Sequence, residues 1–93
     1  MNARMEQMRA LIGAALTPQD LQIEDDSHLH VGHAGAAGGA GHYRVRVVSE
    51  AFAGKNRLAR HRLVYDCLRN LMQADIHALN IVALTPAEAA GGA

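Results

Sequence analysis

Residues 43–48 carry the clearest structural signal in this chain, because apolar and basic side chains alternate along them. Valines and a tyrosine occupy every second position, with arginines between them: Tyr43, Arg44, Val45, Arg46 and Val47. This period of two is typical of a strand that buries one face and exposes the other. A shorter alternation over residues 20–26, with Leu21 and Ile23 as its apolar positions, predicts a second strand.

The segment between these strands reads HLHVGHAGAAGGAGH over residues 28–42 and consists mainly of glycine, alanine and histidine. Two consecutive strands joined by a loop form a hairpin. We therefore expect an antiparallel hairpin whose long tip runs from Gly32 to Gly41. Loops at such positions are common places for binding residues.

Three further segments have helical patterns. Apolar residues recur at three- and four-residue steps over residues 3–16, and Thr17-Pro18 ends that helix. A second helix is expected from Arg57 to Gln73, with Asn56 as its N-cap. Thr85-Pro86-Ala87-Glu88 has the form of a capping box that begins a short third helix.

Residues 77–84 read as a third, largely buried strand, so the expected order is helix, strand, strand, helix, strand, helix. That order predicts one α+β domain over residues 1–88, with helices packed on a small sheet. Residues 89–93 are expected to be a frayed tail. The chain has one phenylalanine and no tryptophan, which disfavours binding of RNA bases by stacking on an aromatic sheet.

The histidines are the strongest indication of a binding site. Four of the six fall within residues 28–42, at positions 28, 30, 33 and 42. Imidazole is a good ligand for zinc, copper, iron and nickel. His77 stands where a turn enters a strand, a firmer position than a loop. The alternatives are surface loop histidines and a His77 that bonds a nearby carbonyl.

Two histidines do not complete a metal site, and Cys67 is the only cysteine, so no disulfide or four-cysteine zinc site can form within one chain. Cys67 is expected to pack on the apolar side of its helix. Any further ligands would come from a partner.

The net charge is zero, but seven of the nine basic residues fall between Arg44 and Arg69. A cluster around Gly54 could contact nucleic-acid phosphates: Lys55, Arg57, Arg60 and Arg62. A solvated helix surface is the alternative interpretation.

No motif of a nucleophilic hydrolase, zinc protease, P-loop or dinucleotide-binding enzyme is present, so we expect no catalysis. No apolar run approaches the roughly 20 residues that cross a bilayer. The N-terminal residues show no secretory signal. A cytoplasmic location and no membrane partner are the resulting expectations.

The segment FAGKNRLARHRLVYDCL, followed by Ile76-His77-Ala78-Leu79, resembles the BolA family, as does DDSHLHVGHAG before HYRVRVVS. The resemblance covers about residues 5–88 and implies a class II KH-like domain with a three-stranded mixed sheet. BolA proteins are partners of monothiol glutaredoxins, with which they share a glutathione-ligated [2Fe-2S] cluster. Some bacterial members are described as DNA-binding transcriptional regulators.

The same resemblance implies roles for individual residues. His77 matches the family's C-terminal cluster ligand, and His33 matches the loop ligand of histidine-type members, nine residues before His42. His30 and His42 are possible substitutes for His33. His61 and Gly54 are assigned to structure or to the partner surface. No cluster is expected in the isolated chain, and a homodimer is possible.

Overall fold

The computed structural model describes residues 3–26, 41–73, 76 and 78–91. The chain begins with helix α1 (Ala3–Leu16), followed by strands β1 (Asp20–Asp25) and β2 (His42–Val48). A 3₁₀ turn, η3 (Glu50–Phe52), then precedes helices α2 (Arg57–Cys67) and α3 (Arg69–Met72). Strand β3 (Ala78–Leu84) and helix α4 (Pro86–Gly91) complete the order.

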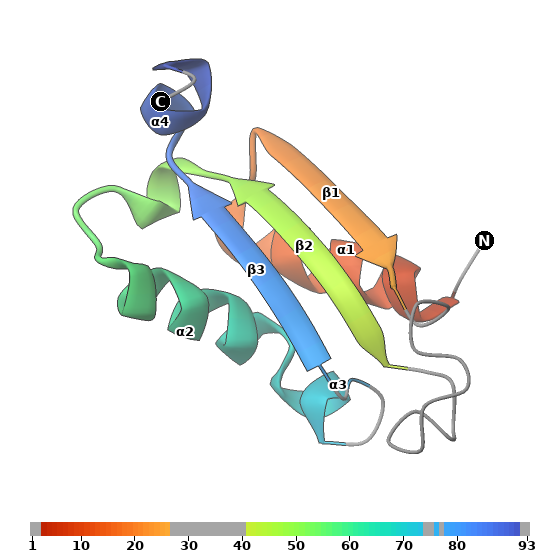
Figure 1. The fold of residues 1–93 in the computed structure, drawn as a ribbon. Helices are drawn as coiled ribbons and strands as arrows, with labels where there is room; N and C mark the ends of the chain where they lie inside the picture. Colours follow the sequence, from red (N-terminus) through yellow and green to blue (C-terminus); the bar gives the residue numbers. More distant parts are fainter. Residues whose placement is uncertain (1–2, 27–40, 74–75, 77, 92–93) are drawn as a thin grey trace.

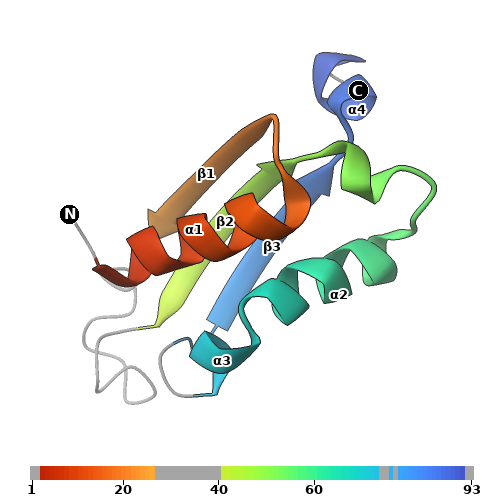
Figure 2. The same cartoon turned by 180° about the vertical axis from the view of Figure 1, so that it is seen from behind.

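The three strands form one mixed sheet, as expected, and their order in it is β1-β2-β3. Strand β2 pairs antiparallel with β1 and parallel with β3, so that Val45 lies opposite Ile23 on one side and Ile81 on the other. Helices α1 and α2 lie on the same face of the sheet (Figures 1 and 2). Among the described elements, none covers the opposite face.

The core lies between the helices and the covered face of the sheet. Aliphatic residues supply most of it, with one tyrosine and one phenylalanine: Met8, Ile12, Leu16, Ile23, Tyr43, Val45, Val47, Phe52, Val64, Leu68, Ile76 and Ile81. The alternation predicted for β2 is confirmed on its covered face, because Tyr43, Val45 and Val47 are all buried. The mixed sheet with its helices confirms the α+β class and is compatible with the KH-like label.

Most element boundaries agree with the sequence predictions. The first helix spans the predicted residues, and Asn56 caps α2 by accepting a hydrogen bond on its side-chain oxygen from the Ala59 N–H at 2.9 Å. The capping box is also confirmed, because the Glu88 N–H donates to the Thr85 hydroxyl and the Thr85 N–H donates to the Glu88 carboxylate.

Two predictions about α2 and β3 were wrong. The helix expected from Arg57 to Gln73 ends at Cys67, since the chain turns at Leu68 and thereby places that side chain fully in the core. Strand β3 is not largely buried, because helices cover only one of its faces and Val82 on the other face is 39% exposed. Helix α4 extends to Gly91, so residues 89–91 are helical in the structure, and fraying of the tail stays a prediction.

Candidate functional site

The start of β2 and the start of β3 lie side by side at one end of the sheet (Figure 1). His42 opens β2 and is the register partner of Ala78, and the Ala78 N–H donates to the Gly41 carbonyl at 2.9 Å. The Asp26 N–H donates to the His42 carbonyl at 2.7 Å, which brings the end of β1 to the same place. Gly41 has a positive φ of 87°, a conformation that favours glycine.

Of the four predicted metal ligands, only His42 falls within the described residues. His42 is half-buried and lines a hollow together with Asp26 and Asn80. His33, His30 and His77 lie outside the described residues, although Ala78 directly follows His77. Within the described part of the chain, no three side chains of the metal-binding types gather closely enough to hold an ion.

The uncovered face of the sheet carries charged side chains that neutralise one another. Arg46 pairs with Asp20 of β1 at 3.0 Å. Arg44 contacts Asp26 at 3.1 Å and Glu24 at 3.8 Å. These two arginines therefore contribute to an internally balanced surface and not to a basic one.

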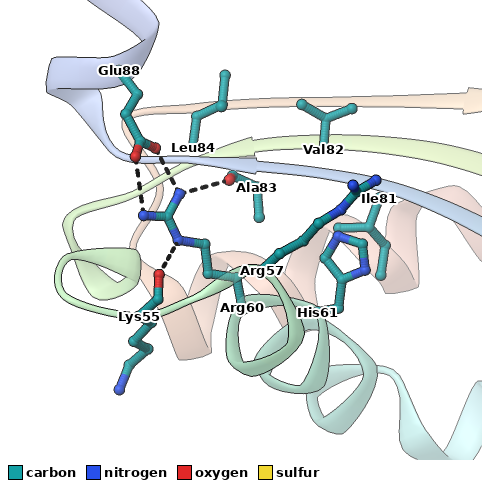
Figure 3. Close-up of a pocket in the computed structure, with 9 residues that line it drawn as sticks. All are labelled: Lys55, Arg57, Arg60, His61, Ile81, Val82, Ala83, Leu84 and Glu88. Carbon is teal, nitrogen blue, oxygen red and sulfur yellow. Dashed lines mark hydrogen bonds and ion pairs between the residues drawn. The ribbon is translucent and has the colours of Figure 1, made fainter.

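The four cations predicted to bind nucleic acid do not act as one group. Arg60 donates from Nη1 and Nη2 to the two carboxylate oxygens of Glu88, at 2.6 and 3.1 Å. It also donates to the backbone carbonyls of Lys55 and Ala83, at 2.8 and 3.1 Å (Figure 3). With its side chain only 15% exposed, Arg60 holds α4 and β3 to α2, so we assign it a structural role.

The pKa values of this pair follow from the same contacts. The Arg60 hydrogen bonds lower the pKa of the Glu88 carboxyl to about 2, with a further contribution from the Thr85 N–H. The hydrogen bond to Glu88 raises the pKa of Arg60. Sequence patterns indicated only a capping role for Glu88, because nothing local points to a partner 28 positions away.

The remaining cations, Lys55, Arg57 and Arg62, are exposed and form no ion pair with any residue that the structure describes. Arg57 lines a hollow between α2 and β3, whereas Arg62 lines a different one on the outer side of α2. Lys55 borders both hollows. Gly54, which directly precedes Lys55, has a φ of 74°, and this positive φ supports the structural role predicted for Gly54.

His61 and Cys67 occupy different parts of α2. His61 is half-buried and lines the hollow between α2 and β3 with Ile81 and Arg57, so it is not part of the core. Cys67 packs against the core and donates from Sγ to the Leu63 carbonyl at 3.1 Å. Burial raises the pKa of the Cys67 thiol, with a smaller contribution from the charge of Asp66, so less of it is thiolate at neutral pH than for an exposed cysteine.

The described residues contain no helix that is both long and apolar enough to cross a bilayer.

Two relatives are named as organellar proteins of Arabidopsis thaliana: SufE-like protein 1, chloroplastic/mitochondrial, and protein BOLA1, chloroplastic. They are 43% and 44% identical to this chain over 95% and 91% of its length. The chain spans only 25% and 55% of those proteins. These names refer to organelles and do not support the cytoplasmic location expected for this chain, which stays a prediction.

The fold comparison agrees with these relatives. The solved BolA domain of SufE1 from Arabidopsis thaliana is 42% identical, with a TM-score of 0.85 over 95% of this chain and 98% of that one. A family model described as BolA-like protein matches residues 12–88. This match covers the sheet, α2 and the Arg60–Glu88 pair, and the chain therefore belongs to the BolA family.

Proposed function

We propose that this chain is a non-catalytic adaptor that pairs with a monothiol glutaredoxin and contributes histidines to a bridging [2Fe-2S] cluster. The observation that carries the proposal is the pairing of His42 with Ala78 at the shared start of β2 and β3. The glycine- and histidine-rich segment joins β1 to β2 at this end of the sheet, and His77 immediately precedes Ala78. Both predicted ligand segments are thus connected to the same end of the sheet.

The chemistry of the donors also supports the proposal. Imidazole can replace thiolate on an iron–sulfur cluster, and the cluster would supply reversible iron binding or one-electron chemistry. His77 and His33 would hold it, with His30 or His42 as substitutes for His33. The ligands that complete the coordination would come from the glutaredoxin and its glutathione, so the chain's own task is to present imidazoles and bind the partner.

The test is co-expression with a monothiol glutaredoxin, anaerobic purification, and measurement of iron content and the visible spectrum. His77→Ala and His33→Ala should each lose the cluster or change its spectrum. His28→Ala is the matched control, because it removes a histidine of the same glycine- and histidine-rich segment that is not among the predicted ligands, and it should leave the iron content unchanged. A colourless wild-type pair, or a spectrum that neither ligand variant changes, would contradict the proposal.

DNA binding is the second candidate, supported by the exposure of Lys55, Arg57 and Arg62. Replacing these three by alanine should weaken binding. It should also make the slope of log affinity against log salt concentration shallower by roughly 0.9 for each phosphate that is no longer neutralised. Arg60 is left unchanged because its variant would also disturb α4. Specific binding that survives in the triple variant would remove these residues from the candidate interface.

A further inference from the structure

The two outer edges of the sheet differ in their chemistry. Strand β1 has the sequence DLQIED, and its three carboxylates discourage pairing with another strand. Strand β3 has the sequence ALNIVAL, without a charge, a proline or a glycine along its seven residues. An uncharged edge of this length favours pairing with a further strand. Among the described elements, only β2 pairs with β3.

The backbone groups available on this edge follow from the contacts to β2. The Ala78 N–H bonds to Gly41, and the Leu84 carbonyl accepts from the Ser49 N–H, so these residues direct their backbone groups toward β2. Because residues alternate along a parallel strand, the intervening positions face outward. These positions are Leu79, Ile81 and Ala83.

Arg60 limits the accessible part of the edge. It already donates to the Ala83 carbonyl at 3.1 Å, which occupies the last outward-facing acceptor. The N–H groups of Leu79, Ile81 and Ala83 and the carbonyls of Leu79 and Ile81 remain as outward-facing groups. They are enough for a short strand to pair with β3.

A cationic hollow of about 360 Å³ lies beside this edge, between α2 and the second half of β3. Figure 3 shows the Arg57 and His61 side chains directed from α2 toward the strand, whereas the Lys55 ammonium points away. Glu88 supplies the one carboxylate in the lining, and Arg60 holds both of its oxygens. An occupant that carries a carboxylate therefore complements this hollow better than a neutral or cationic one.

We propose that the outer edge of β3 pairs with an extended segment of a partner protein, and that an acidic side chain of this segment contacts Arg57. Main-chain hydrogen bonds would provide much of the affinity, and the carboxylate would provide selectivity. A second copy of this chain fits less well. Antiparallel pairing of two β3 strands would bring the two Arg57 side chains, which carry like charges, to the same joined edge. The inference goes beyond the proposed function, because this surface lies along the strand after the predicted iron ligand and requires no iron.

The experiment uses the isotopically labelled full chain and a synthetic probe, a blocked seven-residue peptide of alternating valine and glutamate. The amide resonances of Leu79, Ile81 and Ala83 should shift on titration and exchange more slowly with solvent. Arg57→Glu should weaken binding about tenfold or more, whereas Arg62→Glu should change it less than about twofold. These two variants change the net charge equally, both at exposed positions of α2, so they form a matched pair.

Two control peptides, single-stranded DNA and the concentrated chain alone complete the test. A peptide with lysine in place of glutamate, and a backbone N-methylated glutamate peptide, should both fail to shift the three amides. Equal weakening by Arg57→Glu and Arg62→Glu, or no shift at the edge, would overturn the proposal. Shifts of the Leu79, Ile81 and Ala83 amides on concentrating the chain alone would also overturn it. The same holds if single-stranded DNA shifts these amides and the acidic peptide does not.

Discussion

Arg60 and Glu88 form a bidentate ion pair that joins helix α2 to helix α4 across 28 positions of sequence. The same carboxylate accepts from the Thr85 N–H at 2.9 Å, and the same guanidinium donates to the Ala83 carbonyl. One pair of side chains therefore fixes the end of β3, the start of α4 and the first turns of α2. This explains why an arginine in a basic segment is unavailable to bind a ligand.

The pair predicts a defined dependence of stability on pH. The pKa of Glu88 is about 2 in the folded chain and about 4.5 ordinarily. The ionised Glu88 carboxylate therefore stabilises the folded chain fully above pH 4.5. As the pH falls from about 4.5 to 2, protonation removes that contribution. We expect the Tm of the wild type to fall more steeply over this range than that of Glu88→Gln, measured by circular dichroism.

The control for this prediction is Asp66→Asn, which removes the exposed pair with Arg69 at 3.0 Å. Exposed pairs contribute little to stability, so this variant should keep the wild-type slope. If Glu88→Gln and wild type lost stability in parallel between pH 4.5 and 2, the assignment of the low pKa to Glu88 would be wrong.

Phe52 provides a test of the core, because it is the only phenylalanine and is fully buried in η3. Phe52→Ala should lower the free energy of unfolding by about 3–5 kcal/mol, because it removes buried apolar surface and leaves a cavity. Leu58→Ala, at a position 59% exposed on α2, should change it by less than about 0.5 kcal/mol. Urea denaturation measures both, and similar losses in the two variants would contradict the observed burial.

Local patterns predicted the parts of the fold that depend on neighbours in sequence. The alternation of apolar and basic residues predicted β2, and apolar residues at three- and four-residue steps predicted α1. Capping residues predicted the starts of α2 and α4. The break at Leu68 has no local signal, because no glycine or proline stands there. It depends on the burial of Leu68 among residues distant in sequence, which overrides the helical preference of the segment.

The candidate site shows the same division. The positive φ of Gly54 and the strand position of His42 could be inferred from adjacent residues. Sequence proximity suggested that Arg57, Arg60 and Arg62 act together. At about 100° per residue, however, Arg62 lies on a different side of α2 from Arg57. Arg60 lies on the same side as Arg57, but Glu88 holds its guanidinium. Pairing with Glu88 and the uncharged outer edge of β3 become visible only when the strands are ordered in the sheet.

Asn56 tests how far α2 depends on its cap. Its side-chain oxygen accepts from the Ala59 N–H at 2.9 Å, which satisfies one of the free donors at the helix start. Asn56→Ala should destabilise the chain by about 1 kcal/mol, whereas Asn56→Asp should retain most of the stability. Chemical denaturation compares the three proteins, and an Asn56→Asp variant as weak as Asn56→Ala would argue against the capping bond.

The proposed cluster should depend on pH through its imidazole ligands. A histidine binds metal only when its donor nitrogen is unprotonated, and the ordinary pKa of imidazole is about 6.5. Cluster retention in the complex with glutaredoxin should therefore be full at pH 8 and fall as the pH passes through about 6.5. The visible absorbance of the anaerobic complex measures this, with His28→Ala as the control that should follow the wild-type curve. Absorbance that stays constant between pH 8 and about 5.5 would argue against histidine ligation.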